Sequence, residues 1–289
     1  MQEVAYLNGR FCRLEDAKVS IEDRGFQFAD GVYEVLVAHH GQPFRLAEHM
    51  IRLERSLKEL DLTFDPHAYG LERVIHEGLD RSGFDHTLVY IQITRGAAPR
   101  AHVCGDDLVP TVVVTFKPLA PVPPERRERG VAVKTVEEVR WSRCCIKSIS
   151  LLPNVLEKNR AAREGFFDAI FVTAEGEVRE TCSANVFIVK DGVARTPRAD
   201  EHILRGVTRG YLLECAARAG VPAEETPVTR AQLFNADEVF LSATTFNVMP
   251  VTRIDDHPIG DGKVGPITRR LYEQCLAGIG SVLAACVIA

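Results

Sequence analysis

The chain has 289 residues, which is long enough for two ordinary domains or one large one, and its composition is that of a globular protein. Its 35 lysines and arginines against 40 aspartates and glutamates give a net charge of −5, which excludes a basic surface for nucleic acid and a polybasic membrane anchor. The N-terminus lacks a signal-peptide pattern and no apolar run reaches transmembrane length, so we expect a cytoplasmic protein without nucleic-acid or membrane partners.

The eight cysteines and nine histidines are scattered along the chain. There is no CxxC pair and no HExxH motif, and free thiols in a reducing compartment explain the cysteines better than a disulfide framework does. The sequence spacing therefore predicts no metal site.

Residues 1–118 alternate short strands with amphipathic helices, and we expect them to form a small N-terminal α+β domain. In chain order, the expected elements are a hairpin over 4–11, a strand over 32–39 that pairs with 44–45, helices over 46–60 and 66–81, and strands over 87–94 and 110–117. In the first helix, Met50, Leu53 and Leu57 fall on one face, and Arg52 lies beside this apolar stripe.

Residues 119–129 combine three prolines with a run of charges, and we take 119–125 as the linker to a larger C-terminal domain over 126–289. In chain order, the elements expected there are strands over 130–139, 168–173, 178–189, 238–243 and 248–254, and helices over 151–162, 205–219, 229–234 and 266–276. Short strands before and after each helix favour α+β domains over a doubly wound sheet.

Lys147 is the candidate catalytic nucleophile. It follows an expected strand and precedes an expected helix, next to Ile146 and Ile149 and near Leu151, and so does not lie on a solvated helix face. Desolvation disfavours an ammonium ion, so a lysine among apolar neighbours is expected to have a lowered pKa and to attack carbonyl groups at neutral pH. The sequence leaves open the alternative that the amine simply reaches solvent.

Other polar segments suit the recognition of anions and of a heterocyclic nitrogen. Residues 205–208 open a helix, where unpaired amides favour phosphate, and residues 242–245 offer hydroxyls at the end of a strand. Glu180 interrupts apolar strands, and Arg100 and His102 lie on a cation-rich loop that could clamp a carboxylate. Ordinary turns and solvated charges would explain each segment as well. Together with Lys147, however, these groups are what pyridoxal phosphate needs to process an amino acid.

Seven segments in one order resemble the fold type IV, or class IV, pyridoxal-phosphate aminotransferases, from about residue 7 to residue 276. The segments are EDRGFQFADGVYEV (22–35), EHMIRLERS (48–56), TRGAAPRAH (94–102), RWSRCCIKSISLLPNVLEKNRA (140–161), ETCSANVF (180–187), ILRGVTR (203–209) and SATT (242–245). The TRGAAPRAH segment specifically resembles the D-amino acid transaminases. The resemblance implies a two-domain α+β fold, with a small N-terminal domain and a larger C-terminal domain that contains a barrel-like sheet.

The resemblance also implies which residues hold the pyridoxal 5'-phosphate. Lys147 matches the lysine that forms the Schiff base and moves the proton, Glu180 matches the carboxylate that keeps the pyridine nitrogen protonated, and Leu204 matches the apolar residue on the ring face. The groups that match the phosphate-binding set are Arg52, the amides of Val207 and Thr208, and the hydroxyl of Thr244.

For the substrate, the resemblance implies that Tyr33, Arg100 and His102 trap the α-carboxylate. In that family the arginine and the histidine come from the partner subunit, so a homodimer is implied. Two departures from the family pattern are Cys182, where a small hydroxyl or glycine is more usual, and the apolar tail after Gly280, which has no counterpart in the family.

The reaction implied is the transfer of the amino group of a D-amino acid, such as D-alanine, to a 2-oxo acid, such as 2-oxoglutarate or pyruvate, by a ping-pong mechanism. Three alternatives remain open. They are a branched-chain L-amino acid or (R)-amine transaminase that lacks the trap, a lyase of the aminodeoxychorismate type, and a protein that binds the cofactor without turnover. The presence of both Lys147 and Glu180 counts against the last.

Overall fold

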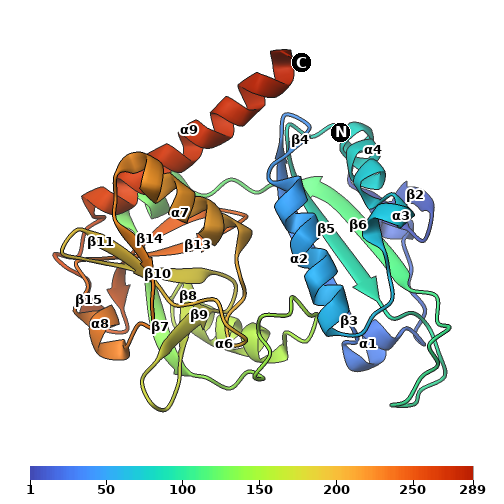
Figure 1. The fold of residues 1–289 in the computed structure, drawn as a ribbon, viewed down its shortest axis with the longest axis horizontal. Coiled ribbons are helices and arrows are strands. Elements are labelled where there is room, and N and C mark those ends of the chain that lie inside the picture. The colour runs from blue at the N-terminus through green and yellow to red at the C-terminus, as the bar shows by residue number, and fades with distance from the viewer. Residues whose placement is uncertain (289) are drawn as a thin grey trace. The chain divides into compact units, whose positions relative to one another are not determined.

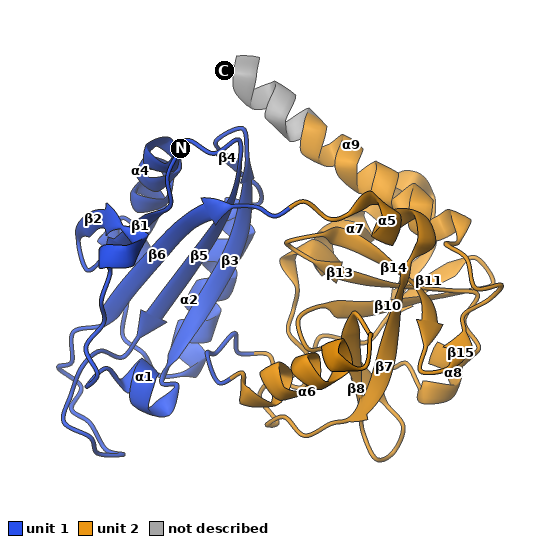
Figure 2. Cartoon of the chain, turned by 180° about the vertical axis from the view of Figure 1, so that it is seen from behind, with its two compact units in different colours: residues 1–120, 146–150 blue, residues 121–145, 151–289 orange. Residues whose placement is uncertain are grey.

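In a computed structural model, residues 1–288 are described, with side chains described as far as Gly280, so the side chains of the apolar tail (281–289) lie outside the described residues. The chain forms two compact units, one of residues 1–120 with 146–150 and the other of residues 121–145 with 151–289 (Figure 2). The short segment that carries Lys147 therefore groups with the N-terminal unit. The domain boundaries expected at residues 118 and 126 stay predictions.

The first unit is built on a six-stranded antiparallel sheet in the order β2-β1-β6-β5-β3-β4 (Figure 1). Helix α2 packs against β3, and α4 packs against β1 and β6. The strands of the sheet are β1 (Val4–Leu7), β2 (Arg10–Arg13), β3 (Gly31–His39), β4 (Gln42–Pro43), β5 (His86–Thr94) and β6 (Thr111–Pro118). The helices of this unit are the 3-10 helix η1 (Leu14–Asp16), α1 (Arg24–Phe28), α2 (Leu46–Glu59), α3 (Pro66–Tyr69) and α4 (Leu71–Ser82).

The apolar stripe predicted for the first long helix is confirmed in α2. Met50, Leu53 and Leu57 are buried, and Arg52 beside them is 9% exposed. Helix α4 approaches its sheet at Gly78, where an added Cβ would lie 1.9 Å from a ring atom of Phe116. Apolar burial on one face of each helix thus fixes the helices on the sheet.

Two expectations about turns in this unit were wrong. The helix predicted over 66–81 is two helices, because Gly70 adopts a left-handed conformation, with a φ of 77°, that ends α3. The strand that pairs with β3 begins at Gln42–Pro43 rather than at Phe44, although the amide of Phe44 also donates to the carbonyl of Val37 at 2.9 Å. His40 and Gly41, with φ values of 49° and 76°, form a two-residue turn, so that Gln42 already pairs with His39.

The second unit contains a nine-stranded mixed sheet that curls into an open barrel, in the order β12-β11-β10-β13-β14-β7-β8-β9 with β15 beside β14 (Figure 1). Strand β7 is parallel to both β14 and β8, whereas β10, β13 and β14 pair antiparallel. Its strands are β7 (Val131–Glu137), β8 (Asp168–Val172), β9 (Val178–Thr181), β10 (Asn185–Lys190), β11 (Val193–Thr196), β12 (Ala223–Glu225), β13 (Glu238–Ala243), β14 (Asn247–Ile254) and β15 (His257–Pro258).

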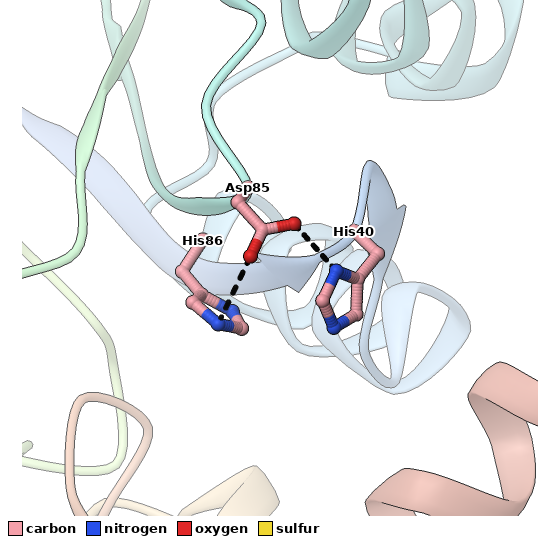
Figure 3. Close-up of side chains that lie close together, drawn as sticks. All are labelled: His40, Asp85 and His86. Atoms are coloured by element: carbon pink, nitrogen blue, oxygen red, sulfur yellow. Dashed lines mark hydrogen bonds and ion pairs between the residues drawn. The ribbon is translucent and has the colours of Figure 1, made fainter.

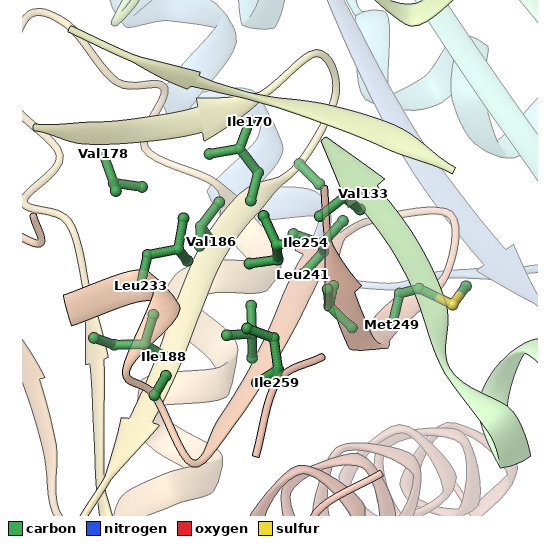
Figure 4. Packing of buried hydrophobic residues seen from close by; sticks show 14 of the residues in the cluster. Val133, Ile170, Val178, Val186, Ile188, Leu233, Leu241, Met249, Ile254 and Ile259 are labelled. Carbon is green, nitrogen blue, oxygen red and sulfur yellow. The ribbon is translucent and has the colours of Figure 1, made fainter. Parts of the chain in front are cut away.

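The helices of the second unit are α5 (Pro124–Arg129), α6 (Leu152–Arg163), α7 (Val207–Ala219), α8 (Arg230–Phe234) and α9 (Pro266–Ile288). Helix α6 packs on β8, while α7 and α9 contact each other and β13. Inside the curled sheet, aliphatic side chains from β7, β8, β10, β13 and β14 form the core, among them Val133, Ile170, Val186, Leu241 and Met249 (Figure 4). No helix in the described part of the chain is long and apolar enough to cross a membrane.

The connection that carries Lys147 is irregular, as predicted, and runs from the end of β7 to the start of α6, with Pro153 in the first turn of the helix. The structure also contains elements that the sequence patterns did not predict, namely η1, α1, β11, β12 and β15, and α5 occupies part of the stretch expected to be a linker. All six are short. Hydrophobic periodicity needs more residues than these elements contain.

Candidate active site

Lys147 is fixed at its backbone and half-buried at its side chain. Its carbonyl accepts a hydrogen bond from the amide of Tyr33 at 2.9 Å, and its own amide donates to Ser56 Oγ at 3.2 Å. The amine Nζ lies 4.2 Å from the centre of the Tyr33 ring. The amine of Lys147 therefore lies over the face of the Tyr33 ring. That ring stacks in turn on the ring of Tyr90, with ring centres 5.8 Å apart.

Helix α2 presents Arg52 to a carboxylate buried in β3. Glu34 is fully buried and accepts hydrogen bonds from Arg52 Nε at 2.9 Å and Nη2 at 2.5 Å, and its Oε1 lies 3.0 Å from His49 Nδ1. Burial alone would raise the pKa of Glu34, but the charge of Arg52 and the bond to His49 hold it far below its usual range. The guanidinium is thus held in one orientation by a bidentate ion pair.

In the second unit, Glu180 on β9 is held by a buried arginine. Arg140 Nη1 donates to Glu180 at 2.7 Å, while its Nε and Nη2 donate to Glu138, at 2.9 and 2.6 Å. The guanidinium also covers the Phe171 ring, 4.4 Å from its centre. Burial opposes the charge of Arg140, but the two carboxylates raise its pKa overall, so the arginine stays cationic and favours the ionised form of Glu180.

The segment before α7 is also tied to Glu180. The amide of Leu204 donates to both carboxylate oxygens, each at 3.2 Å, and Asn185 Nδ2 bridges Glu180 Oε2 and the carbonyl of Leu204, at 3.2 and 2.9 Å. Gly206 lies against the side-chain amide of Asn185, and a Cβ added to Gly206 would fall 2.1 Å from Asn185 Oδ1. The carboxylate, the Leu204 backbone and the start of α7 therefore form one hydrogen-bonded assembly.

The start of α7 has the properties of an anion site. Val207 and Thr208 are its first two residues, and among the described residues no side chain caps the helix at Gly206. The amides of a first helical turn have no intrahelical acceptor and carry the positive end of the helix dipole. Thr244 lies in the turn between β13 and β14, and Ser242 two residues earlier has a buried Oγ without a hydrogen-bond partner in the described part of the chain.

The cation-rich loop after β5 is anchored through α1. Arg24 is paired with Asp30 at 2.8 Å and donates to the carbonyls of Ala101 and His102, at 2.7 and 3.2 Å. The side chains of Arg100 and His102 are exposed and both lie on Phe28, 4.6 and 5.6 Å from its ring centre. The structure thus brings Arg100 and His102 together on one ring. It places Tyr33 next to Lys147.

The expected residues divide between the units, with Lys147, Arg52, Tyr33, Arg100 and His102 in the first and Glu180, Leu204, Val207, Thr208 and Thr244 in the second. Sequence reasoning assigned no role to the residues that position them. These are Glu34 and His49 around Arg52, and Arg140, Glu138 and Asn185 around Glu180. Four of these five residues lie within the segments that resemble the family. The sequence feature that could have revealed the ion pair with Arg52 is the single glutamate, Glu34, within an otherwise apolar predicted strand.

Comparison with known proteins gives the same family over most of the chain. Residues 31–254 match the family described as amino-transferase class IV. The chain belongs to the class IV aminotransferases. A D-alanine aminotransferase of Listeria monocytogenes serotype 1/2a is 41% identical to this aminotransferase over 271 residues, which cover 92% of this chain and 93% of the relative.

Solved structures of fold type IV proteins resemble the aminotransferase as well. A branched-chain amino acid aminotransferase of Escherichia coli superposes with a TM-score of 0.87 at 26% identity, covering 94% of this chain and 93% of the other. A 4-amino-4-deoxychorismate lyase of Pseudomonas aeruginosa superposes with a TM-score of 0.82 at 27% identity, covering 93% and 97%. The expected α+β fold of a class IV aminotransferase is therefore confirmed.

Proposed function

We propose that this aminotransferase uses pyridoxal 5'-phosphate to move the amino group of a D-amino acid, such as D-alanine, to 2-oxoglutarate or pyruvate by a ping-pong mechanism in the cytoplasm. The resemblance to D-alanine aminotransferases over 92% of the chain supports this substrate class. The structural observation that carries the proposal is the arginine and the histidine, Arg100 and His102, that both lie on Phe28 in an anchored loop. Such a pair suits the α-carboxylate of an amino acid.

The residues present fit the cofactor. The start of α7 offers uncapped amides to a phosphate, and the buried Ser242 Oγ has no hydrogen-bond partner within the described residues, as expected near an absent polar group. Glu180, kept ionised by Arg140, suits a protonated ring nitrogen, and Lys147 supplies the amine. When bound, pyridoxal phosphate supplies an electron sink that stabilises negative charge at the substrate α-carbon.

In this proposal each residue has a defined task. Lys147 would hold the cofactor through Nζ and, as a free amine, would move a proton at the substrate α-carbon. Glu180 would hold the proton on the ring nitrogen, and Leu204 would pack on the ring. The phosphate would be held by Arg52, the amides of Val207 and Thr208, and the Thr244 hydroxyl.

The substrate trap implies a homodimer. We propose that Tyr33 acts beside Lys147, which its ring contacts, and that Arg100 and His102 act on the partner's substrate. Their exposure within one chain supports this, because a carboxylate clamp shared between subunits must be accessible in the isolated subunit.

The first test is a single half-reaction followed by absorbance. The cofactor-loaded protein is mixed separately with D-alanine and with L-leucine, without a 2-oxo acid. We expect D-alanine alone to remove the visible absorbance and 2-oxoglutarate to restore it. A response to L-leucine alone would refute the D-specific proposal in favour of the branched-chain alternative, whose fold this chain shares.

The assignment of Lys147 and the shared trap can be tested in one mixing experiment. Lys147→Ala should lose the borohydride-trappable attachment of the cofactor, and Arg100→Ala should raise the KM for D-alanine far more than the cofactor Kd. The mixed variants are assayed at a D-alanine concentration far below the KM of Arg100→Ala, where each variant alone has little activity. If the trap comes from the partner, mixing restores one intact site per heterodimer, or about 25% of wild-type activity after random exchange. If both groups serve the same chain's substrate, mixing restores nothing.

The lyase alternative has its own support in the likeness to 4-amino-4-deoxychorismate lyase. It predicts release of pyruvate from 4-amino-4-deoxychorismate without any 2-oxo acid. The transaminase proposal predicts no such release and a strict requirement for an amino acceptor.

A further inference from the structure

A second group of polar side chains lies at the end of the first unit's sheet that is far from Lys147. His39 is the last residue of β3, His40 opens the turn to β4, and Asp85 immediately precedes His86, the first residue of β5. Figure 3 shows the side chains of His40, Asp85 and His86. The register of the sheet pairs His39 with His86, and the amide of His40 donates to the carbonyl of Asp85 at 2.6 Å. The backbone therefore fixes these four residues together.

The nitrogen and oxygen atoms of three of these side chains converge. His40 Nδ1 lies 2.5 Å from Asp85 Oδ1, and His86 Nε2 lies 3.5 Å from Asp85 Oδ2. One ligand atom from each of His40, Asp85 and His86 falls within 4.8 Å of the others. In a tetrahedral zinc site with bonds of about 2.1 Å, ligand atoms are about 3.4 Å apart. This is close to the 3.5 Å between His86 Nε2 and Asp85 Oδ2.

We propose that His40, Asp85 and His86 form a binding site for a divalent transition-metal ion of the zinc type. Two imidazoles and one carboxylate are ligands that Zn²⁺ accepts, with a water molecule at the fourth position. The three side chains are exposed, which gives the ion a direct path of entry. Binding needs His40 Nδ1 and Asp85 Oδ1, which are 2.5 Å apart, to separate by about 1 Å, whereas His86 Nε2 and Asp85 Oδ2 already lie 3.5 Å apart.

His39 acts as a positioning residue for this site. Its Nδ1 lies 3.1 Å from Nδ1 of His86, on the side of the ring opposite to Nε2. With His39 as the acceptor in this contact, His86 carries its proton on Nδ1 and presents the Nε2 lone pair to the metal.

The site is distinct from the groups proposed for amino transfer. Tyr33 and His39 are six positions apart on β3, which is roughly 20 Å along an extended strand. A metal there would join the β3–β4 turn to the start of β5 and stabilise the open end of the sheet. The separation of His40 from Asp85 by 45 positions in the sequence explains why spacing motifs do not find it.

The test is a titration of the cofactor-loaded dialysed enzyme with ZnCl₂ by isothermal calorimetry, after treatment with a chelator. We expect one ion per chain at this site, a Kd raised at least about 100-fold in His86→Gln and in Asp85→Asn, and a rise of about 10- to 100-fold in His39→Leu. His76→Gln is the matched control, since His76 is an exposed histidine on α4. It should leave the affinity unchanged.

Thermal unfolding provides a second readout, in which zinc bound by thiols elsewhere contributes equally to the wild type and to each variant. Zinc should raise the Tm of the wild type and of His76→Gln, but not that of His86→Gln or Asp85→Asn, and should leave transaminase turnover unchanged. Absence of zinc binding in the wild type, or equal binding in His86→Gln, Asp85→Asn and the control, would overturn the site. An unchanged affinity in His39→Leu would overturn the positioning role alone.

Discussion

The buried ion pair of Glu34 and Arg52 leads to a sharp prediction about stability. Replacing Glu34 with Gln keeps the shape of the side chain but removes the charge that compensates a guanidinium only 9% exposed. One of the two bonds from Arg52, at 2.9 and 2.5 Å, would then face an amide NH₂ group rather than an acceptor. Removing one partner of a buried pair costs about 3–5 kcal/mol, and we expect about 3 kcal/mol for this isosteric change.

The assay is thermal unfolding of the cofactor-free protein, so that altered cofactor binding does not contribute to the shift. For a unit of this size, about 3 kcal/mol corresponds to a Tm lower by about 10 °C. Glu48→Gln is the matched control, because Glu48 lies on α2, as Arg52 does, and pairs with Arg45 at the surface. Its loss should cost less than about 1 kcal/mol.

The pH dependence of this difference has a definite sign. The pKa of Glu34 is lowered by folding, so its contribution is present above the ordinary glutamate pKa and is lost as the pH falls toward the folded-state value. The Tm difference between wild type and Glu34→Gln should therefore be constant from about pH 8 to pH 5 and shrink below about pH 4. A variant as stable as Glu48→Gln, or a difference that grows in acid, would refute the reasoning.

Two further predictions concern the assembly around Glu180. Gly206→Ala should push Asn185 away from Glu180 and weaken cofactor binding by about tenfold or more, measured by equilibrium titration, whereas Gly210→Ala, whose added Cβ meets nothing within 4 Å, should leave it unchanged. Equal effects would contradict the role of the close approach. Arg140→Met should raise the pKa of Glu180 by removing its cation and lower kcat by about tenfold or more, while Arg140→Lys should retain part of the activity. A pH profile of kcat identical to that of the wild type would show that Arg140 does not control this carboxylate.

The sequence by itself determined the local structure of the longer elements. The apolar spacing of Met50, Leu53 and Leu57 predicts α2 and its buried face, because side chains three and four apart share one side of a helix. The same reasoning placed Lys147 in an irregular connection between a strand and a helix. Short elements were missed, and the break at Gly70 was missed because a single glycine within a periodic pattern does not by itself reveal a left-handed backbone.

Only the tertiary structure decided which distant groups meet. Arg140 reaches Glu180 over 40 positions, and Arg52 reaches Glu34 because α2 packs on β3. Likewise, the register of β3 with β5 brings His40 to Asp85. Such contacts depend on sheet register and helix packing, which are set by the burial of many side chains at once, and not by the spacing of the few polar residues that they bring together.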